Sequence, residues 1–213
     1  MTQQRGTRVV AVVGVLLFWA GVFGAAALVD GYASSEDYIS SLASRGSSVA
    51  ALGIGAFLAS AVAQAATSRT VFTGWRAHWC AVFVLFGGVA TASVATFRAS
   101  CPGGPPGCAL GDDPPGDWVD AVHGVSVGLY ELCTLAAMLI LAGGALRRTS
   151  ALPRWLGLLS LVAAIGSVLL IGQTNGDNIG LWQRLWLANN LAWLLVVAWA
   201  ATGHHRDDVR GPL

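Results

Sequence analysis

Long apolar runs alternate with short polar connections along the whole chain. Six runs approach the length of about 20 mainly apolar residues that a bilayer-crossing helix needs. Backbone polar groups in lipid must be paired within their own segment, so each run is expected to be α-helical. The expected spans are residues 9–29, 48–66, 79–97, 119–146, 155–171 and 185–201. This pattern predicts an all-α integral membrane bundle of six transmembrane helices, forming one domain over residues 1–213.

Composition favours the same class of protein. Of 213 residues, 55% are hydrophobic and 11% are charged, whereas a soluble domain carries about 25% charged residues. The net charge is +1, so a nucleic-acid partner, which would need a concentrated basic face, is not expected. The basic residues are all Arg. Together with the load of Ala and Gly, this composition is typical of a GC-rich bacterial genome and predicts a multi-pass protein of the bacterial inner membrane.

The arginines divide unequally between the two sides of this predicted bundle. Loops on the cytoplasmic side of a membrane carry an excess of Arg and Lys. Three arginines would lie on one side: Arg45, Arg98 and Arg184. Nine would lie on the other: Arg5, Arg8, Arg69, Arg76, Arg147, Arg148, Arg154, Arg206 and Arg210. The split predicts that both termini are cytoplasmic.

The first span has an alternative interpretation as a signal peptide. Arg5 and Arg8 precede an apolar run that ends in the small residues 25–27, and a secretory signal has the same order of features. The apolar core of a signal peptide is about 7–15 residues long, and this run is longer. We therefore expect an uncleaved transmembrane helix.

Two of the four cysteines are expected to form a disulfide. Cys101 and Cys108 flank a Pro/Gly-rich loop on the predicted outer side, where conditions are oxidising. A shared metal is the less favoured alternative, because no nearby His or third Cys completes a site. Cys80 and Cys133 lie inside spans and are expected to be small apolar fillers.

The fourth span contains ionisable residues, which mark a functional site by default because burying them in a membrane is costly. Glu131 lies about twelve residues into the span, roughly 18 Å from its outer end by helical rise. His123 and Tyr130 are seven residues apart and share a helix face, and Asp120 stands at the mouth. We expect this polar stripe to point into the bundle.

Further polar residues are expected to meet that stripe. The sixth span contributes Gln183 and Arg184 at its outer end, with Asn189 and Asn190 deeper, and we expect Arg184 to pair with Asp120 or to reach Glu131. Together they predict a polar cavity that opens outward between spans two, four and six. The ligand-binding set would be Ser40, Arg45, His123, Tyr130, Glu131, Gln183, Arg184 and Asn189. In the alternative interpretation, Glu131 is protonated and holds the bundle together through a hydrogen bond to a neighbouring helix.

Several cofactor-dependent chemistries lack the residues they need. A haem held by two His needs both at one depth, but His78 is expected at the inner end of its span and His123 near the outer end. A zinc hydrolase needs three or four ligands, and only His123, Asp120 and Glu131 share one half. A serine hydrolase of the α/β type needs a nucleophile elbow, and the sequence contains no such motif. We expect no metal or other cofactor.

Three short motifs resemble a known family. These are Ile39–Ala43 before the second span, Phe97–Cys108 with His123-Gly124 at the start of the fourth, and Gly180–Leu185 at the start of the sixth. Together they resemble the bacterial membrane proteins called domain of unknown function 998. Two positions depart from the pattern: Ser41 replaces an acidic residue and Arg98 replaces a Pro. The resemblance implies a six-helix bundle without an established role, and it places motif residues at Ser40, His123 and Arg184.

Three functions remain open from the sequence. The favoured hypothesis is a non-enzymatic protein that binds a lipid or small amphiphile, with Arg184 meeting an anionic head group and His123 and Glu131 setting its protonation. The second is a lipid-modifying or terpene-cyclase-like enzyme with Glu131 or Asp120 as general acid and His123 as a further catalytic candidate. The third is a proton-coupled transporter using Glu131, which is disfavoured because no inverted repeat is visible. The expected partners are membrane lipids and the small amphiphile.

Overall fold

The computed structural model describes residues 2–75, 77–100, 118–147 and 152–203. These residues form six α-helices and one 3₁₀ helix, and they contain no strand. The elements are α1 (Thr2–Ala26), η1 (Ile39–Ala43), α2 (Ala50–Trp75), α3 (His78–Thr96), α4 (Trp118–Leu146), α5 (Arg154–Gly172) and α6 (Ile179–Gly203). All six α-helices are long and apolar enough to cross a membrane, which confirms the predicted six-span, all-α class. Cys101 and Cys108, the predicted disulfide, lie outside the described residues, while Cys80 and Cys133 are free thiols.

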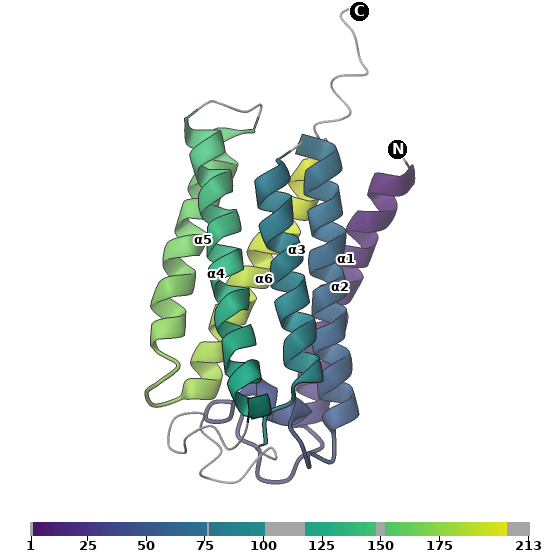
Figure 1. Ribbon diagram of the computed structural model, residues 1–213, viewed down its shortest axis with the longest axis vertical. Helices are drawn as coiled ribbons and strands as arrows, with labels where there is room; N and C mark the ends of the chain where they lie inside the picture. The colour runs from purple at the N-terminus through teal and green to yellow at the C-terminus, as the bar shows by residue number, and fades with distance from the viewer. Residues whose placement is uncertain (1, 76, 101–117, 148–151, 204–213) are drawn as a thin grey trace, which may run out of the picture.

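The helices run up and down in chain order, so α1 begins and α6 ends at the same end of the bundle (Figure 1). We call this the terminal end. The opposite end is the loop end, where α1 and α3 finish and α4 and α6 begin. Consecutive helices pack side by side, and α6 also contacts α2 and α1, which closes the bundle. More of α6 is buried than of any other span.

Three helices, α1, α2 and α6, are longer by four or more residues than the apolar pattern predicts, and α1 begins at Thr2, before the expected start at residue 9. α2 continues to Trp75, past the expected end at residue 66, and α6 begins at Ile179, before the expected start at residue 185. In α2 the hydroxyls of Thr67 and Thr70 bond the carbonyl oxygens of residues 63 and 66 at 2.9 Å. Hydroxyls that bond within their own helix add no exposed polar group, so polar residues here extend the helix instead of ending it.

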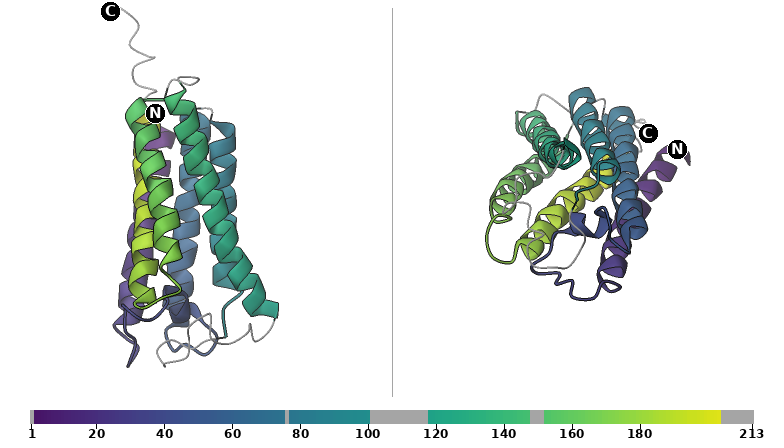
Figure 2. Two further views of the ribbon diagram at one scale, coloured as in Figure 1. Left: turned by 90° about the vertical axis from the view of Figure 1, so that its left-hand side faces the viewer. Right: turned by 60° about the horizontal axis from the view of Figure 1, so that its bottom comes forward.

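The connection after α1 folds back onto the loop end of the bundle, and we call residues 32–45 the cap. All five residues of η1 are buried, and Figure 2 (right) shows η1 between α6 and the α1–α2 pair. Two glycines allow this approach. A Cβ on Gly53 of α2 would lie 2.7 Å from the Ala43 nitrogen, and one on Gly180 of α6 would clash with the Asp37 carbonyl oxygen. The cap is therefore packed into the bundle.

The two halves of the bundle differ in the character of their cores. Towards the terminal end, large aliphatic side chains are fully buried, including Val71, Met138, Leu156 and Val197. The buried acidic, basic and histidine side chains of the described residues lie between the loop end and the middle of the bundle: Asp120, His123, Glu131 and Arg184. A functional site is therefore sought in that half.

Candidate functional site

Arg184 anchors the cap to α6. Its guanidinium donates to the carbonyl oxygens of Asp37 at 3.0 Å and Gly180 at 2.9 Å, and to the Tyr32 hydroxyl at 2.5 Å. The expected pairing of Arg184 with Asp120 or Glu131 is therefore wrong. The reason is the earlier start of α6, which places Arg184 in its second turn, beside the cap and away from α4.

Tyr32 is the aromatic partner in this anchor. Its hydroxyl donates to the Tyr38 carbonyl oxygen at 3.1 Å while accepting from Arg184. Burial raises the pKa of Tyr32 above its ordinary value of 10.0, and the charge of Arg184 offsets part of that rise. The hydroxyl therefore keeps its proton at neutral pH and can both donate and accept.

Asp120 forms a second anchor, which joins the cap to the ends of α3 and α4. Its carboxylate accepts from the Ser100 backbone nitrogen and hydroxyl, both at 2.7 Å, and from the Arg45 guanidinium at 3.3 Å. The backbone of Arg45 joins the same two segments, because its nitrogen donates to the carbonyl oxygen of Ala99, after the end of α3, at 2.8 Å. Asp120 and Arg45 thus stabilise the loop end together, at a site distinct from Arg184.

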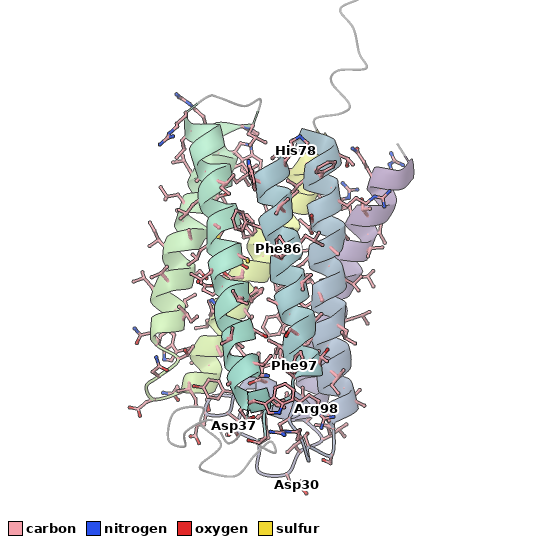
Figure 3. The ribbon with its side chains drawn as sticks, in the orientation of Figure 1. Asp30, Asp37, His78, Phe86, Phe97 and Arg98 are labelled. Atoms are coloured by element: carbon pink, nitrogen blue, oxygen red, sulfur yellow. The ribbon has the colours of Figure 1, made fainter. Side chains whose placement is uncertain are left out.

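His123 ties α4 to the end of α3. Its ring is 1% exposed, and Nδ1 lies 2.8 Å from the Phe97 carbonyl oxygen, so Nδ1 carries the hydrogen and donates. Nε2 has no hydrogen-bond partner among the described residues. Figure 3 shows Phe97 at the loop end and His78 at the opposite end. The two histidines therefore lie far apart, as the sequence predicts.

A small cavity lies between α6 and the wall formed by α2, α3 and α4, and we call it the seam cavity. Its space is about 40 Å³, which is room for a few water molecules. None of its lining residues is charged. They are Phe18, Ser40, Phe57, Ser60, Thr91, Val94, Val127, Tyr130, Gln183, Trp186 and Leu187. Spans one and three and the cap thus contribute, beyond the expected spans two, four and six.

Free hydrogen-bond donors mark the cap side of the seam cavity. The Ile39 backbone nitrogen donates to Gln183 Oε1 at 2.6 Å. An N–H can only donate, so this bond fixes the orientation of the amide and turns Nε2 towards other partners. No described residue bonds Gln183 Nε2 or the Ser40 hydroxyl. Thr91, by contrast, accepts from Gln64 at 2.9 Å and donates to the Gly87 carbonyl oxygen at 3.0 Å.

Tyr130 separates the seam cavity from a second, smaller one. Its ring packs edge to face against Trp186, with centroids 5.6 Å apart, and Tyr130 lines both cavities. The second cavity has a volume of about 10 Å³. Its polar lining residues include Gln64, Thr134 and Asn190. Polar groups therefore continue past Tyr130 towards the middle of the bundle.

Glu131 lies behind this wall, in contact with α5 and α6. Ser167 Oγ is 2.8 and 3.0 Å from its two carboxyl oxygens. Trp186 Nε1 donates to Oε2 at 2.9 Å, and Asn190 Nδ2 lies 3.3 Å from the same oxygen. All three partners are uncharged. Glu131 is therefore linked by hydrogen bonds to the seam cavity through Trp186 and to the second cavity through Asn190.

The predicted ligand set thus divides into three groups. Ser40, Tyr130 and Gln183 line the seam cavity. Glu131 lies behind the seam-cavity residue Trp186, and Asn189 lies behind Asn190 of the second cavity, which it bonds at 3.1 Å. The anchoring group bonds the cap or the α3–α4 connection and does not line the cavity: Arg45, Asp120, His123 and Arg184.

Several lining residues escape the sequence-based prediction. Ser60 and Gln64 stand one turn apart inside an apolar span, a spacing that places both on one helix face and that could have drawn attention to α2. Trp186 gives no such signal, because a Trp near a span end is also typical of the membrane interface. Ser167 is one of two buried serines of α5, and its role depends on Glu131 of another helix.

The family described as "Protein of unknown function (DUF998)" matches residues 12–200. The chain belongs to this family. No curated protein and no solved structure matches it. In this DUF998 chain the three motif residues occupy different places. Ser40 is at the cavity wall, His123 at the α3–α4 connection and Arg184 in the cap anchor.

Proposed function

We propose that this DUF998 protein binds a small neutral amphiphile in the seam cavity, with the polar group of the ligand towards the cap. The observation that carries the proposal is the pairing of two free donors, Gln183 Nε2 and the Ser40 hydroxyl, with a mainly apolar wall. Buried polar groups are nearly always hydrogen-bonded. A ligand oxygen at the cap side of the cavity would satisfy both donors.

The wall below these donors suits an apolar tail. Phe57, Val94 and Val127 present hydrocarbon to the cavity, and burying apolar surface stabilises a complex by about 25 cal/mol per Å². The Thr91 hydroxyl is already bonded. The ligand would therefore carry its acceptor oxygen at one end, as an alcohol, ketone or ester does.

Charge argues for a neutral head group over the anionic one expected from the sequence. Among the residues that the structure describes, no charged side chain lines the seam cavity, and the Arg184 guanidinium is engaged by the cap. An uncompensated charge is costly to bury. A carboxylate at this position would lack a counter-ion.

The size of the cavity requires movement on binding. About 40 Å³ holds only the polar group and adjacent carbons of an amphiphile. The cap would have to shift to admit more, and it is held by hydrogen bonds that each contribute about 1 kcal/mol net. A ligand that prefers the shifted cap would stabilise that conformation in proportion to its differential affinity.

The same proposal includes a location. In the sequence, three arginines fall on the side of the predicted bundle that contains the cap and nine fall on the other side, so we place the cap outside a bacterial inner membrane. The ligand would enter from the outer leaflet or the outer aqueous side.

An enzymatic role has less support from the geometry. Asp120 is bonded to Ser100 and Arg45, and Glu131 lies behind Trp186. Neither carboxyl lines the seam cavity, so neither is placed to protonate a molecule held there.

Three probes of equal chain length test the proposal: a medium-chain alcohol, the fatty acid and the alkane. Each is added to purified protein in detergent and thermal unfolding is measured. The alcohol should raise Tm most, because it combines a neutral oxygen for the two donors with an apolar tail. At a concentration of 100 times Kd, a bound ligand stabilises the folded protein by about 2.7 kcal/mol. Val127→Phe, which fills the cavity, should abolish the shift. Val125→Phe makes the same change at a position 61% exposed on α4 and should preserve it. Equal shifts with all three probes, or in both variants, would reject the proposal.

A further inference from the structure

The hydrogen-bond network around Glu131 allows its protons to be counted, starting from a backbone carbonyl. Asn189 Nδ2 donates to the Ala163 carbonyl oxygen at 2.9 Å. A carbonyl oxygen can only accept, so this bond identifies the nitrogen of the Asn189 amide. The same nitrogen lies 3.1 Å from an atom of the Asn190 amide. That atom must accept, so it is Asn190 Oδ1.

The next bond uses the hydroxyl proton of Ser167. Ser167 Oγ lies 2.8 Å from Asn190 Oδ1. Two oxygens at this distance need a hydrogen between them, and an amide oxygen has none to give. The Ser167 hydroxyl therefore donates to Asn190.

A second oxygen also stands at hydrogen-bond distance from Ser167. Glu131 Oε1 is 2.8 Å from Ser167 Oγ, but the single proton of the hydroxyl is already committed to Asn190. Glu131 Oε2 receives the Trp186 N–H at 2.9 Å and faces the Asn190 amide nitrogen at 3.3 Å. The missing hydrogen must belong to Glu131, and Oε1 is the oxygen that carries it.

We infer that Glu131 is a buried proton-binding site: a neutral acid that donates from Oε1 to Ser167 and accepts from Trp186 and Asn190. The surrounding charges agree with this assignment. α5 presents Ser167 to Glu131, and α6 presents Trp186 and Asn190. The basic residues of these two helices are elsewhere, Arg184 in the cap anchor and Arg154 in the first turn of α5 at the terminal end. On α4 itself, His123 bonds Phe97 and Asp120 bonds Ser100. An ionised carboxylate would thus be buried without a cation, which is costly.

This proton site adjoins both cavities, because Trp186 walls one and Asn190 walls the other. Any movement of these two side chains would remove donors from Glu131 Oε2. Occupancy of the cavities and protonation of Glu131 are therefore linked in this geometry. The protonation itself does not rest on the proposed ligand.

Infrared difference spectroscopy of the purified full-length chain tests the inference. Subtracting the Glu131→Gln spectrum from that of the wild type should show the C=O stretching band of a protonated carboxylic acid. The matched control is Glu36→Gln, which removes an exposed carboxyl group of the cap and should give carboxylate bands instead. Carboxylate bands in the Glu131 difference would overturn the inference. So would failure of Glu131→Gln to fold, because glutamine reproduces the donor and acceptors of the neutral acid.

Ser167→Ala provides a second measurement. The acid band should persist in this variant and move to higher frequency, because the acceptor of the Glu131 proton is gone. If the C=O band of a protonated acid is absent from both the wild type and Ser167→Ala, this second measurement also contradicts the inference. Neither result depends on a ligand, so failure here leaves the seam-cavity proposal to its own test.

Discussion

Arg184 donates a hydrogen bond to the Tyr32 hydroxyl at 2.5 Å, so a side chain of α6 holds the loop that follows α1. The two residues are 152 positions apart in sequence. Asp37 accepts from the same guanidinium through its carbonyl oxygen. This contact is one of the bonds that hold the cap on the bundle, and it explains why a buried arginine can lie near the end of a span without a carboxylate partner.

The first prediction concerns this anchor. Arg184→Gln should destabilise the protein by about 1–3 kcal/mol, because it leaves the carbonyl oxygens of Asp37 in the cap and Gly180 in α6 without a charged donor. Tyr32→Phe should cost less, since it removes one partner of the same group. The double variant should be more stable than the sum of the two losses predicts, because residues in one network are not additive. Thermal unfolding of the four proteins checks this, and full additivity would show that the contact is not formed.

Glu131 gives the second prediction. Glu131→Gln should lose less than about 1 kcal/mol of stability, in line with interhelical hydrogen bonds in membranes. Glu131→Leu should lose more, about 1–3 kcal/mol for each donor left unpaired, and Trp186 and Asn190 are two such donors. Equal losses in the two variants would mean that the hydrogen bonds of Glu131 do not stabilise the bundle.

The sequence predicts the number of helices well because the membrane imposes a simple rule. A span must be apolar over its length and satisfy its backbone internally, and both properties are local. The apolar pattern underestimates the length of α2, because a hydrophobicity scale counts Thr67 and Thr70 as polar residues. It does not show that their hydroxyls bond back within the helix.

The candidate site could be predicted only in part. Ser40, Tyr130 and Gln183 stand out as polar residues in or beside apolar runs, and they do line the seam cavity. The partner of Arg184 could not be predicted, because Tyr32 reaches it only through the fold of the cap. The neutral lining of the cavity likewise depends on which way Arg184 turns, which periodicity does not determine.

The third prediction is the orientation of the bundle, which rests on the unequal arginine count. Reporter fusions after Arg76 and Arg148 should be active in the cytoplasm, and a fusion after Gly104 should be active outside. The charge asymmetry across short loops is the physical reason. A reversed pattern at any two of these positions would contradict the proposed location of the cap.

A disulfide between Cys101 and Cys108 is the fourth prediction. Closing so short a loop should stabilise the protein by about 2–3 kcal/mol through the entropy of the unfolded chain. Mass spectrometry of protein purified without reductant should find the two cysteines in one linked peptide. Cys80 and Cys133, which lie within spans, serve as internal free-thiol controls. Two alkylated thiols at 101 and 108 under oxidising conditions would exclude the bond.

The fifth prediction is the most direct test of the central proposal, that a neutral amphiphile occupies the seam cavity. A medium-chain alcohol carrying a photoreactive diazirine on its tail is irradiated with the purified protein, and the labelled residues are mapped by mass spectrometry. Labels should fall on cavity residues such as Val94, Tyr130 and Leu187. They should disappear in Val127→Phe and remain in Val125→Phe. Labels confined to lipid-facing side chains such as Leu129 and Leu132, which are 49% and 65% exposed, and unchanged by Val127→Phe, would contradict it.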